Sequence, residues 1–136
     1  MIFMKKIARP KLILMVVLFT MSFKCYSQTD HQASYGSNAD VGEFAVINGM
    51  QMYYEIYGRG EPLILIHGNG QSIADLKHQI SYFSRNFKVL VADSRGHGKS
   101  ELNTNNLNYE LMAKDWFSLI SHLGIKKAHV FGWSDG

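Results

Sequence analysis

The last five residues of the 136-residue chain restrict its possible folds more than any other stretch. They read Gly132-Trp133-Ser134-Asp135-Gly136, a G-x-S-x-G pattern, and the apolar run Ala128–Phe131 leads into them. This pattern is typical of a nucleophile elbow, in which a buried strand is followed by a sharp turn carrying an exposed serine, and then by a helix. Glycine suits both ends of the pattern, because a Cβ there would collide with neighbouring elements around so tight a turn.

The first 27 residues have the features of a secretory signal peptide. Residues 1–11 are basic, Leu12–Phe23 is almost wholly apolar, and the small residues Cys25 and Ser27 precede an expected cut before Gln28. A 12-residue helix rises about 18 Å, which is too short for a hydrocarbon core of about 30 Å, so a cleaved signal is favoured over a membrane anchor. A lipid-modified Cys25 is disfavoured by the bulky Lys24 before it. We expect a secreted or periplasmic protein with no membrane attachment after cleavage.

Removal of this segment changes the charge balance. The chain carries a formal +3, but five of its 14 basic residues lie before the cut and all 11 acidic residues lie after it. The remainder has nine basic and 11 acidic residues, a net charge of −2, which gives no support for nucleic-acid binding. The single cysteine, Cys25, is lost with the signal, so we expect no disulfide, no thiolate metal site and no bound metal.

The rest of the chain divides into two predicted parts. Residues 28–42 are polar and small and predict a flexible leader, and residues 43–136 predict a folded domain. The domain opens with two alternating apolar runs, Glu43–Ile47 and Met50–Tyr57. The pair Asn48-Gly49 joins them, and because both central positions of a type I′ turn need positive φ, this pair predicts an antiparallel hairpin.

Three further strands are expected, at Leu63–Ile66, Phe87–Ala92 and Ala128–Phe131. Helical periodicity separates them: a first helix capped by Ser72 with Asp75 three residues later, and a second that ends at Gly124. The apolar face of the first helix contains Ile73, Leu76, Ile80 and Phe83, and that of the second contains Met112, Trp116, Leu119, Ile120 and Leu123. Strands joined by crossover helices lie parallel, so the prediction is an α/β fold with a mostly parallel sheet and an N-terminal antiparallel hairpin.

Three loops follow the carboxyl ends of these strands, His67–Gly70, Asp93–Ser100 and Gly132–Gly136. Ligands collect beyond this end of a parallel sheet, so the three loops should converge on one crevice. Their motifs, in this order and spacing, resemble those of the α/β-hydrolase superfamily from about Glu43 to the end of the chain. The residues Trp133 and Asp135 resemble the branch with carboxylesterases, lactonases and biphenyl-hydrolase-like enzymes.

This resemblance implies a serine hydrolase that cleaves an ester, lactone or related small acyl substrate through an acyl-enzyme, without a cofactor. Ser134 would be the nucleophile, and the backbone N–H groups of Asn69 and Asp135 would form the oxyanion hole. His67 would hold its loop by hydrogen bonds, with Gly68 and Gly70 giving that loop its freedom. Gly132, Gly136 and Trp133 would shape the elbow.

Other polar residues near these loops are assigned structural roles. Asp93 and Arg95 are expected to pair with each other and order their turn. His97 is the wrong candidate for the general base, since the family's chain order is serine, then acid, then histidine. Trp116 and Trp133 are expected in the core, with Trp133 alternatively on a pocket wall. The remaining candidate histidines are expected on the surface or as satisfied core residues: His78, His122 and His129.

The catalytic acid and histidine of the family would follow Gly136. We therefore expect this chain to be the N-terminal part of a hydrolase and to be inactive alone. Three alternatives are weighed against this reading. A dinucleotide-binding fingerprint around Gly68–Gly70 fails at its third glycine, where Ile73 stands. A non-catalytic hydrolase-like binding protein or remnant stays open, as does a lyase or peroxidase that uses the same serine.

Overall fold

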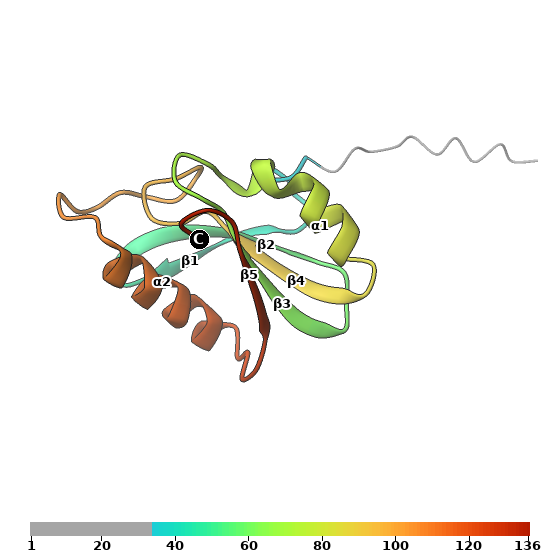
Figure 1. The fold of residues 1–136 in the computed structure, drawn as a ribbon. Helices are drawn as coiled ribbons and strands as arrows, with labels where there is room; N and C mark the ends of the chain where they lie inside the picture. The colour runs from blue at the N-terminus through green and yellow to red at the C-terminus, as the bar shows by residue number, and fades with distance from the viewer. Residues whose placement is uncertain (1–33) are drawn as a thin grey trace, which may run out of the picture. The chain divides into compact units, whose positions relative to one another are not determined.

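The described part of the protein, residues 34–136 of a computed structural model, contains one five-stranded sheet in the order β1-β2-β4-β3-β5 (Figure 1). The strands are β1 (Gly42–Ile47), β2 (Met50–Tyr57), β3 (Glu61–Ile66), β4 (Phe87–Ala92) and β5 (His129–Gly132). Between them lie the 3₁₀ turn η1 (Ile73–Leu76) and the helices α1 (Lys77–Phe83) and α2 (Tyr109–His122). The predicted signal peptide and its cut lie outside the described residues.

The N-terminal hairpin is confirmed. Strands β1 and β2 pair antiparallel, with Ile47 opposite Met50, and the connecting residues Asn48 and Gly49 have φ of 47° and 78°. Both values lie in the left-handed region that a two-residue type I′ connection needs. Strand β2 also pairs antiparallel with β4, which attaches the hairpin to the rest of the sheet.

The parallel part of the sheet is confirmed as well. Strand β3 pairs in parallel with β4 on one side and with β5 on the other. The first crossover differs from the expected single helix, because it starts as the 3₁₀ turn η1 and becomes α-helical only at Lys77. At its start, the Ser72 N–H donates to the Asp75 carboxylate (2.8 Å), as the sequence pattern predicts.

Helix α2 lies on one face of the sheet and α1 on the other (Figure 1), and apolar side chains pack against both faces. Helix α2 contributes Trp116 and Leu119 to the cluster on one face, while η1 and α1 contribute Ile73, Leu76 and Ile80 to the cluster on the other. Strand β4, in the middle of the sheet, is buried on both faces from Val89 to Ala92. The carboxyl ends of β3 and β4 are therefore held by a core on either side. Strand β5, at the edge of the sheet, is mostly exposed, with Val130 64% exposed, which differs from the buried strand that the elbow motif predicts.

The described residues of the predicted leader, 34–42, form hydrogen bonds with the domain. The backbone N–H groups of Gly36 and Asn38 donate to the carboxylate of Glu55, at 2.9 and 3.0 Å. The hydroxyls of Tyr53 and Tyr57 donate to the same carboxylate, each at 2.8 Å. Burial, and then the bond to Glu55, raises the pKa of both tyrosines, so they remain donors. A fully buried acid on β2 thus anchors the segment before β1.

No helix within residues 34–136 combines the length and the apolar character that a membrane crossing requires.

Candidate functional site

The turn after β5 places Ser134 in a strained conformation. Ser134 has φ of 57°, and Asn48 is the one other non-glycine residue with positive φ in the described part of the chain. The Trp133 N–H donates to the Ile66 carbonyl and the Gly136 N–H to the Trp133 carbonyl, each at 3.0 Å. Such a conformation costs about 1–3 kcal/mol and persists only where the surrounding structure fixes it. The serine itself is exposed at the carboxyl end of the sheet.

The glycines around this turn lie against backbone atoms. A Cβ on Gly132 would overlap the Gly136 carbonyl, and one on Gly136 would lie 2.5 Å from the Ile66 oxygen. A Cβ on Gly68, in the loop after β3, would lie 2.9 Å from the Cβ of Ser134. Gly70 has φ of 70° and open space around it. The loop after β3 and the turn after β5 therefore meet directly at Ser134.

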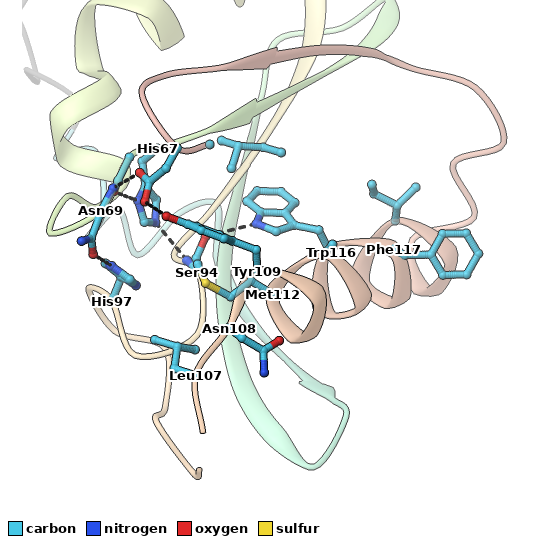
Figure 2. A pocket seen from close by; sticks show the side chains of 16 residues that line it. His67, Asn69, Ser94, His97, Leu107, Asn108, Tyr109, Met112, Trp116 and Phe117 are labelled. Carbon is cyan, nitrogen blue, oxygen red and sulfur yellow. Dashed lines mark hydrogen bonds between the residues drawn. The ribbon is translucent and has the colours of Figure 1, made fainter. Parts of the chain in front are cut away.

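The buried imidazole of His67 ties two of the three loops together. Its Nε2 accepts from the Ser94 N–H (3.0 Å), so its Nδ1 carries the proton and donates to the Gly68 carbonyl (2.8 Å) (Figure 2). Both ring nitrogens are engaged by backbone groups, which leaves neither free for proton transfer. Burial lowers the pKa of His67, against the opposing effect of its bond to Gly68, and this favours the neutral ring that the contacts require.

We predict a pH effect on stability from His67. Its pKa is lowered in the folded protein and close to 6.5 in the unfolded chain, so the unfolded chain binds the proton more tightly. The contribution of neutral His67 is therefore complete above pH 6.5 and is lost as the pH falls toward the folded-state pKa. Urea unfolding at pH 7.5, 6.5 and 5.5 should show this loss in the native protein and a smaller one in His67→Gln. Equal pH dependence in both proteins would contradict the assignment.

One of the two predicted oxyanion donors, the backbone N–H of Asn69, contacts the side chain of Asp135. The backbone N–H of Asn69 donates to the Oδ1 of Asp135 at 2.5 Å, and the Tyr109 hydroxyl donates to Oδ2 at 3.0 Å. The Asn69 N–H is the largest factor that lowers the pKa of the Asp135 carboxyl, and the Tyr109 hydroxyl and the backbone N–H of Asp135 add to it. A negatively charged group therefore lies among the donors that the sequence motif assigns to an oxyanion.

The expected pair between Asp93 and Arg95 is wrong. The Asp93 carboxylate accepts from two backbone N–H groups instead, those of Ile73 and Lys99, both at 2.8 Å. With these bonds Asp93 joins its loop to η1. Arg95 turns to helix α2 and forms a bidentate pair with Asp115, at 2.7 Å from Nε and 2.8 Å from Nη2, and both side chains are buried.

His97 is partly buried and lies near the crevice. Its Nδ1 lies 3.0 Å from the Arg95 carbonyl, and its Nε2 lies 3.4 Å from the Asn69 Oδ1. No hydrogen bond joins Ser134 to a histidine among residues 34–136, so His97 is not placed as its base there. The three other histidines discussed above are all exposed: His78, His122 and His129.

A pocket of about 840 Å³ opens beside the elbow. Asn69, His97 and Asp135 are among its polar lining residues. Side chains of α2, among them Met112 and Trp116, line a mostly apolar wall (Figure 2). Trp116 is in the core as expected, and its indole N–H donates to Ser94 Oγ at 3.1 Å. Trp133 differs from both expectations, since it is 53% exposed and does not line this pocket. An elongated ligand with an apolar portion would fit this space.

Sequence reasoning missed three contributors to the site. The sequence does not indicate that Tyr109 and Met112 line the pocket, because an asparagine-rich loop separates them from the three loop motifs. The third is Asp115, which binds Arg95. A signal for it exists: Asp115 is three residues after Met112 and four before Leu119, which places a carboxylate on the apolar face of the helix. The residues from 34 onward contain no group of three or more potential ligands that could hold a metal ion.

Comparison with known proteins gives a consistent set of similarities. A family model described as alpha/beta hydrolase fold matches residues 61–136. A soluble epoxide hydrolase from Corynebacterium sp. (strain C12) is 40% identical over 88 residues, which cover 65% of this chain and 31% of that protein. The human serine hydrolase BPHL is 31% identical over 112 residues, covering 76% of this chain and 38% of that protein.

Solved structures share the fold of the described residues. The epoxide hydrolase CorEH matches with a TM-score of 0.67 and 38% identity, over 70% of this chain and 34% of that one. An enol-lactonase from Burkholderia xenovorans LB400 matches with a TM-score of 0.65 and 29% identity, over 68% of this chain and 37% of that one. The chain spans about a third of the length of the proteins that it matches.

Proposed function

Since the chain belongs to the family with the alpha/beta hydrolase fold, we propose that its protein is a serine hydrolase that acts on an ester, lactone or related acyl compound. The observation that carries this proposal is the left-handed Ser134 at the end of β5, in contact with the glycine loop that presents the Asn69 N–H. A hydroxyl held this way is accessible to a substrate carbonyl placed in the pocket.

Each residue then has a defined role. The Oγ of Ser134 attacks the carbonyl carbon, and the carbonyl oxygen takes the negative charge of the tetrahedral intermediate. The N–H groups of Asn69 and Asp135 stabilise this oxygen, an effect worth about 10²–10³ in turnover per donor. A serine hydroxyl needs a neighbouring base to remove its proton. We propose that a histidine later in the full-length protein supplies this base, as in the serine–acid–histidine order of the family.

The serine itself favours acyl compounds over epoxides. Attack of a serine hydroxyl on a carbonyl gives an ester, which water can cleave to regenerate the enzyme. Attack of the same hydroxyl on an epoxide carbon would give an ether, which water does not cleave under these conditions. Relatives of the chain include proteins named as epoxide hydrolases, as a serine hydrolase and as an enol-lactonase. For this chain, a serine at position 134 supports an acyl compound, and not an epoxide, as the substrate.

The choice between these chemistries is tested with two substrates on the full-length protein. We expect p-nitrophenyl butyrate to be hydrolysed with a burst of nitrophenolate that equals the enzyme concentration, because this activated ester acylates Ser134 faster than water cleaves the acyl-enzyme. Styrene oxide should give no diol. Diol formation without ester hydrolysis would contradict the proposal. Absence of both activities, with butyrate still bound, would favour the non-catalytic alternative.

We also propose that the protein is exported and works on small molecules outside the cytoplasm. The support is the sequence of residues 1–27, with its basic start, apolar run and small residues before Gln28. N-terminal sequencing of the protein recovered from its host tests this. A mature N-terminus at Gln28 is expected, and an intact Met1 in the cytoplasm would contradict export.

A further inference from the structure

The side chain of Asp135 lies where the negative charge of the reaction is expected. Its Oδ1 accepts from the Asn69 N–H at 2.5 Å, a charge-assisted hydrogen bond. A substrate oxyanion would need this same N–H. The carboxylate therefore shows that the position beside Ser134 binds an anion, and it also fills that position.

Tyr109 gives the carboxylate a second attachment. Its hydroxyl donates to Oδ2 of Asp135 at 3.0 Å, from the first residue of α2. The start of this helix is fixed, because Asn108 Oδ1 accepts from the Leu111 N–H at 2.9 Å. The Tyr109 ring itself is 66% exposed. The backbone of Tyr109 is thus held by the start of α2, while its exposed side chain can move and release the Asp135 carboxylate.

Among the residues that line the pocket, His97 is the one charged neighbour that helps lower the pKa of the Asp135 carboxyl, after the larger effects of the Asn69 N–H and the Tyr109 hydroxyl. No lysine or arginine is among the residues that line the pocket, and Asp135 is the single acidic residue there. The bonds from the Asn69 N–H and the Tyr109 hydroxyl are the contacts from other residues that hold the carboxylate directly. An incoming anion has to compete with Asp135 for the Asn69 N–H.

We propose that Asp135 is a built-in, displaceable occupant of the oxyanion position and that Tyr109 is the positioning residue that holds it there. The inference rests on the proposed function, because it concerns the same oxyanion position. Substrate carbonyls and carboxylate products bind only when Asp135 has moved away. If the position is open in about a tenth of the molecules, the apparent affinity for a carboxylate is about tenfold weaker than at an open site.

Calorimetric titration of the full-length protein with butyrate at pH 7.5 measures this competition without any need for turnover. Asp135→Ala should bind butyrate about tenfold more tightly than the native protein, since the occupant is gone. Tyr109→Phe should bind it about threefold more tightly, since the carboxylate is held less firmly while the net charge is unchanged. A general charge effect would leave Tyr109→Phe at the native value.

Glu110→Gln is the matched control for loss of a nearby negative charge. Glu110 is exposed, pairs with Lys114 at 2.7 Å and does not line this pocket, so its variant should bind butyrate as the native protein does. The inference is overturned if Asp135→Ala binds butyrate no more tightly than Glu110→Gln, or if Tyr109→Phe binds butyrate no more tightly than the native protein. Labelling of Ser134 by a fluorophosphonate is followed in the same proteins. Tighter butyrate binding without labelling would support Asp135 as the occupant of the oxyanion position and would refute Ser134 as the nucleophile.

Discussion

Ser134→Ala is expected to reduce ester turnover by the full-length protein by about 10⁵-fold or more, the scale observed when the nucleophile of a serine hydrolase is removed. The reason is chemical, because no acyl-enzyme can form without the hydroxyl. Binding of butyrate should change little, since the Asn69 N–H is a backbone group that the substitution leaves in place. The measurement is steady-state hydrolysis of p-nitrophenyl butyrate together with the burst.

Two further variants test whether the loss of turnover is due to the Ser134 hydroxyl itself. Ser121→Ala changes an exposed serine on α2 and should retain native turnover. Ser134→Gly keeps the left-handed turn at low conformational cost and should be as inactive as the alanine variant. Residual turnover above about one hundredth of native in both Ser134 variants would show that another group performs the attack.

The second large effect is expected on stability. Asp115→Ala should lower the free energy of unfolding by about 3–5 kcal/mol, because it leaves the Arg95 guanidinium buried without its carboxylate. Arg95 and Asp115 are only 2% and 1% exposed. The carboxylate also accepts from the side-chain amide of Asn48 at 2.9 Å, so the loss extends to the hairpin turn. Urea unfolding of the full-length protein measures the difference.

A double substitution distinguishes the effect of an unpaired buried charge from the effect of lost side-chain packing. Arg95→Met combined with Asp115→Leu removes both charges and should be clearly less destabilising than Asp115→Ala, since no unpaired charge stays buried. Lys114→Ala breaks the exposed pair with Glu110, at 2.7 Å, and should cost less than about 1 kcal/mol. A loss below 1 kcal/mol for Asp115→Ala would show that water reaches Arg95 in the folded protein.

The sequence predicts those parts of the fold that local rules determine. The turn Asn48-Gly49 is one, because the need for positive φ is met by the two residues themselves. The parallel arrangement of β3, β4 and β5 is another, because it follows from the crossover helices between them. The convergence of the loops after these strands follows in turn, and the contact between Gly68 and Ser134 agrees with it.

Partner choice across the fold is harder to predict. Asp93 and Arg95 are two residues apart and have opposite charges, but each binds a group 20 residues away in the sequence. Asp93 lies at the end of β4, where its carboxylate accepts from the N–H of Ile73 at the start of η1. Arg95 faces Asp115 on α2. The same holds for residues 34–41, whose polar composition gives no sign of the buried Glu55 that binds them. Such pairs depend on tertiary packing rather than on local pattern.

The most direct test of the account is the site of covalent modification by a fluorophosphonate in the full-length protein. Peptide mapping by mass spectrometry should place a single phosphonate on Ser134, with labelling abolished in Ser134→Ala and retained in Ser121→Ala. A phosphonate on any other residue, or no modification while the protein still hydrolyses p-nitrophenyl butyrate, would contradict the claim that the strained serine after β5 is the nucleophile.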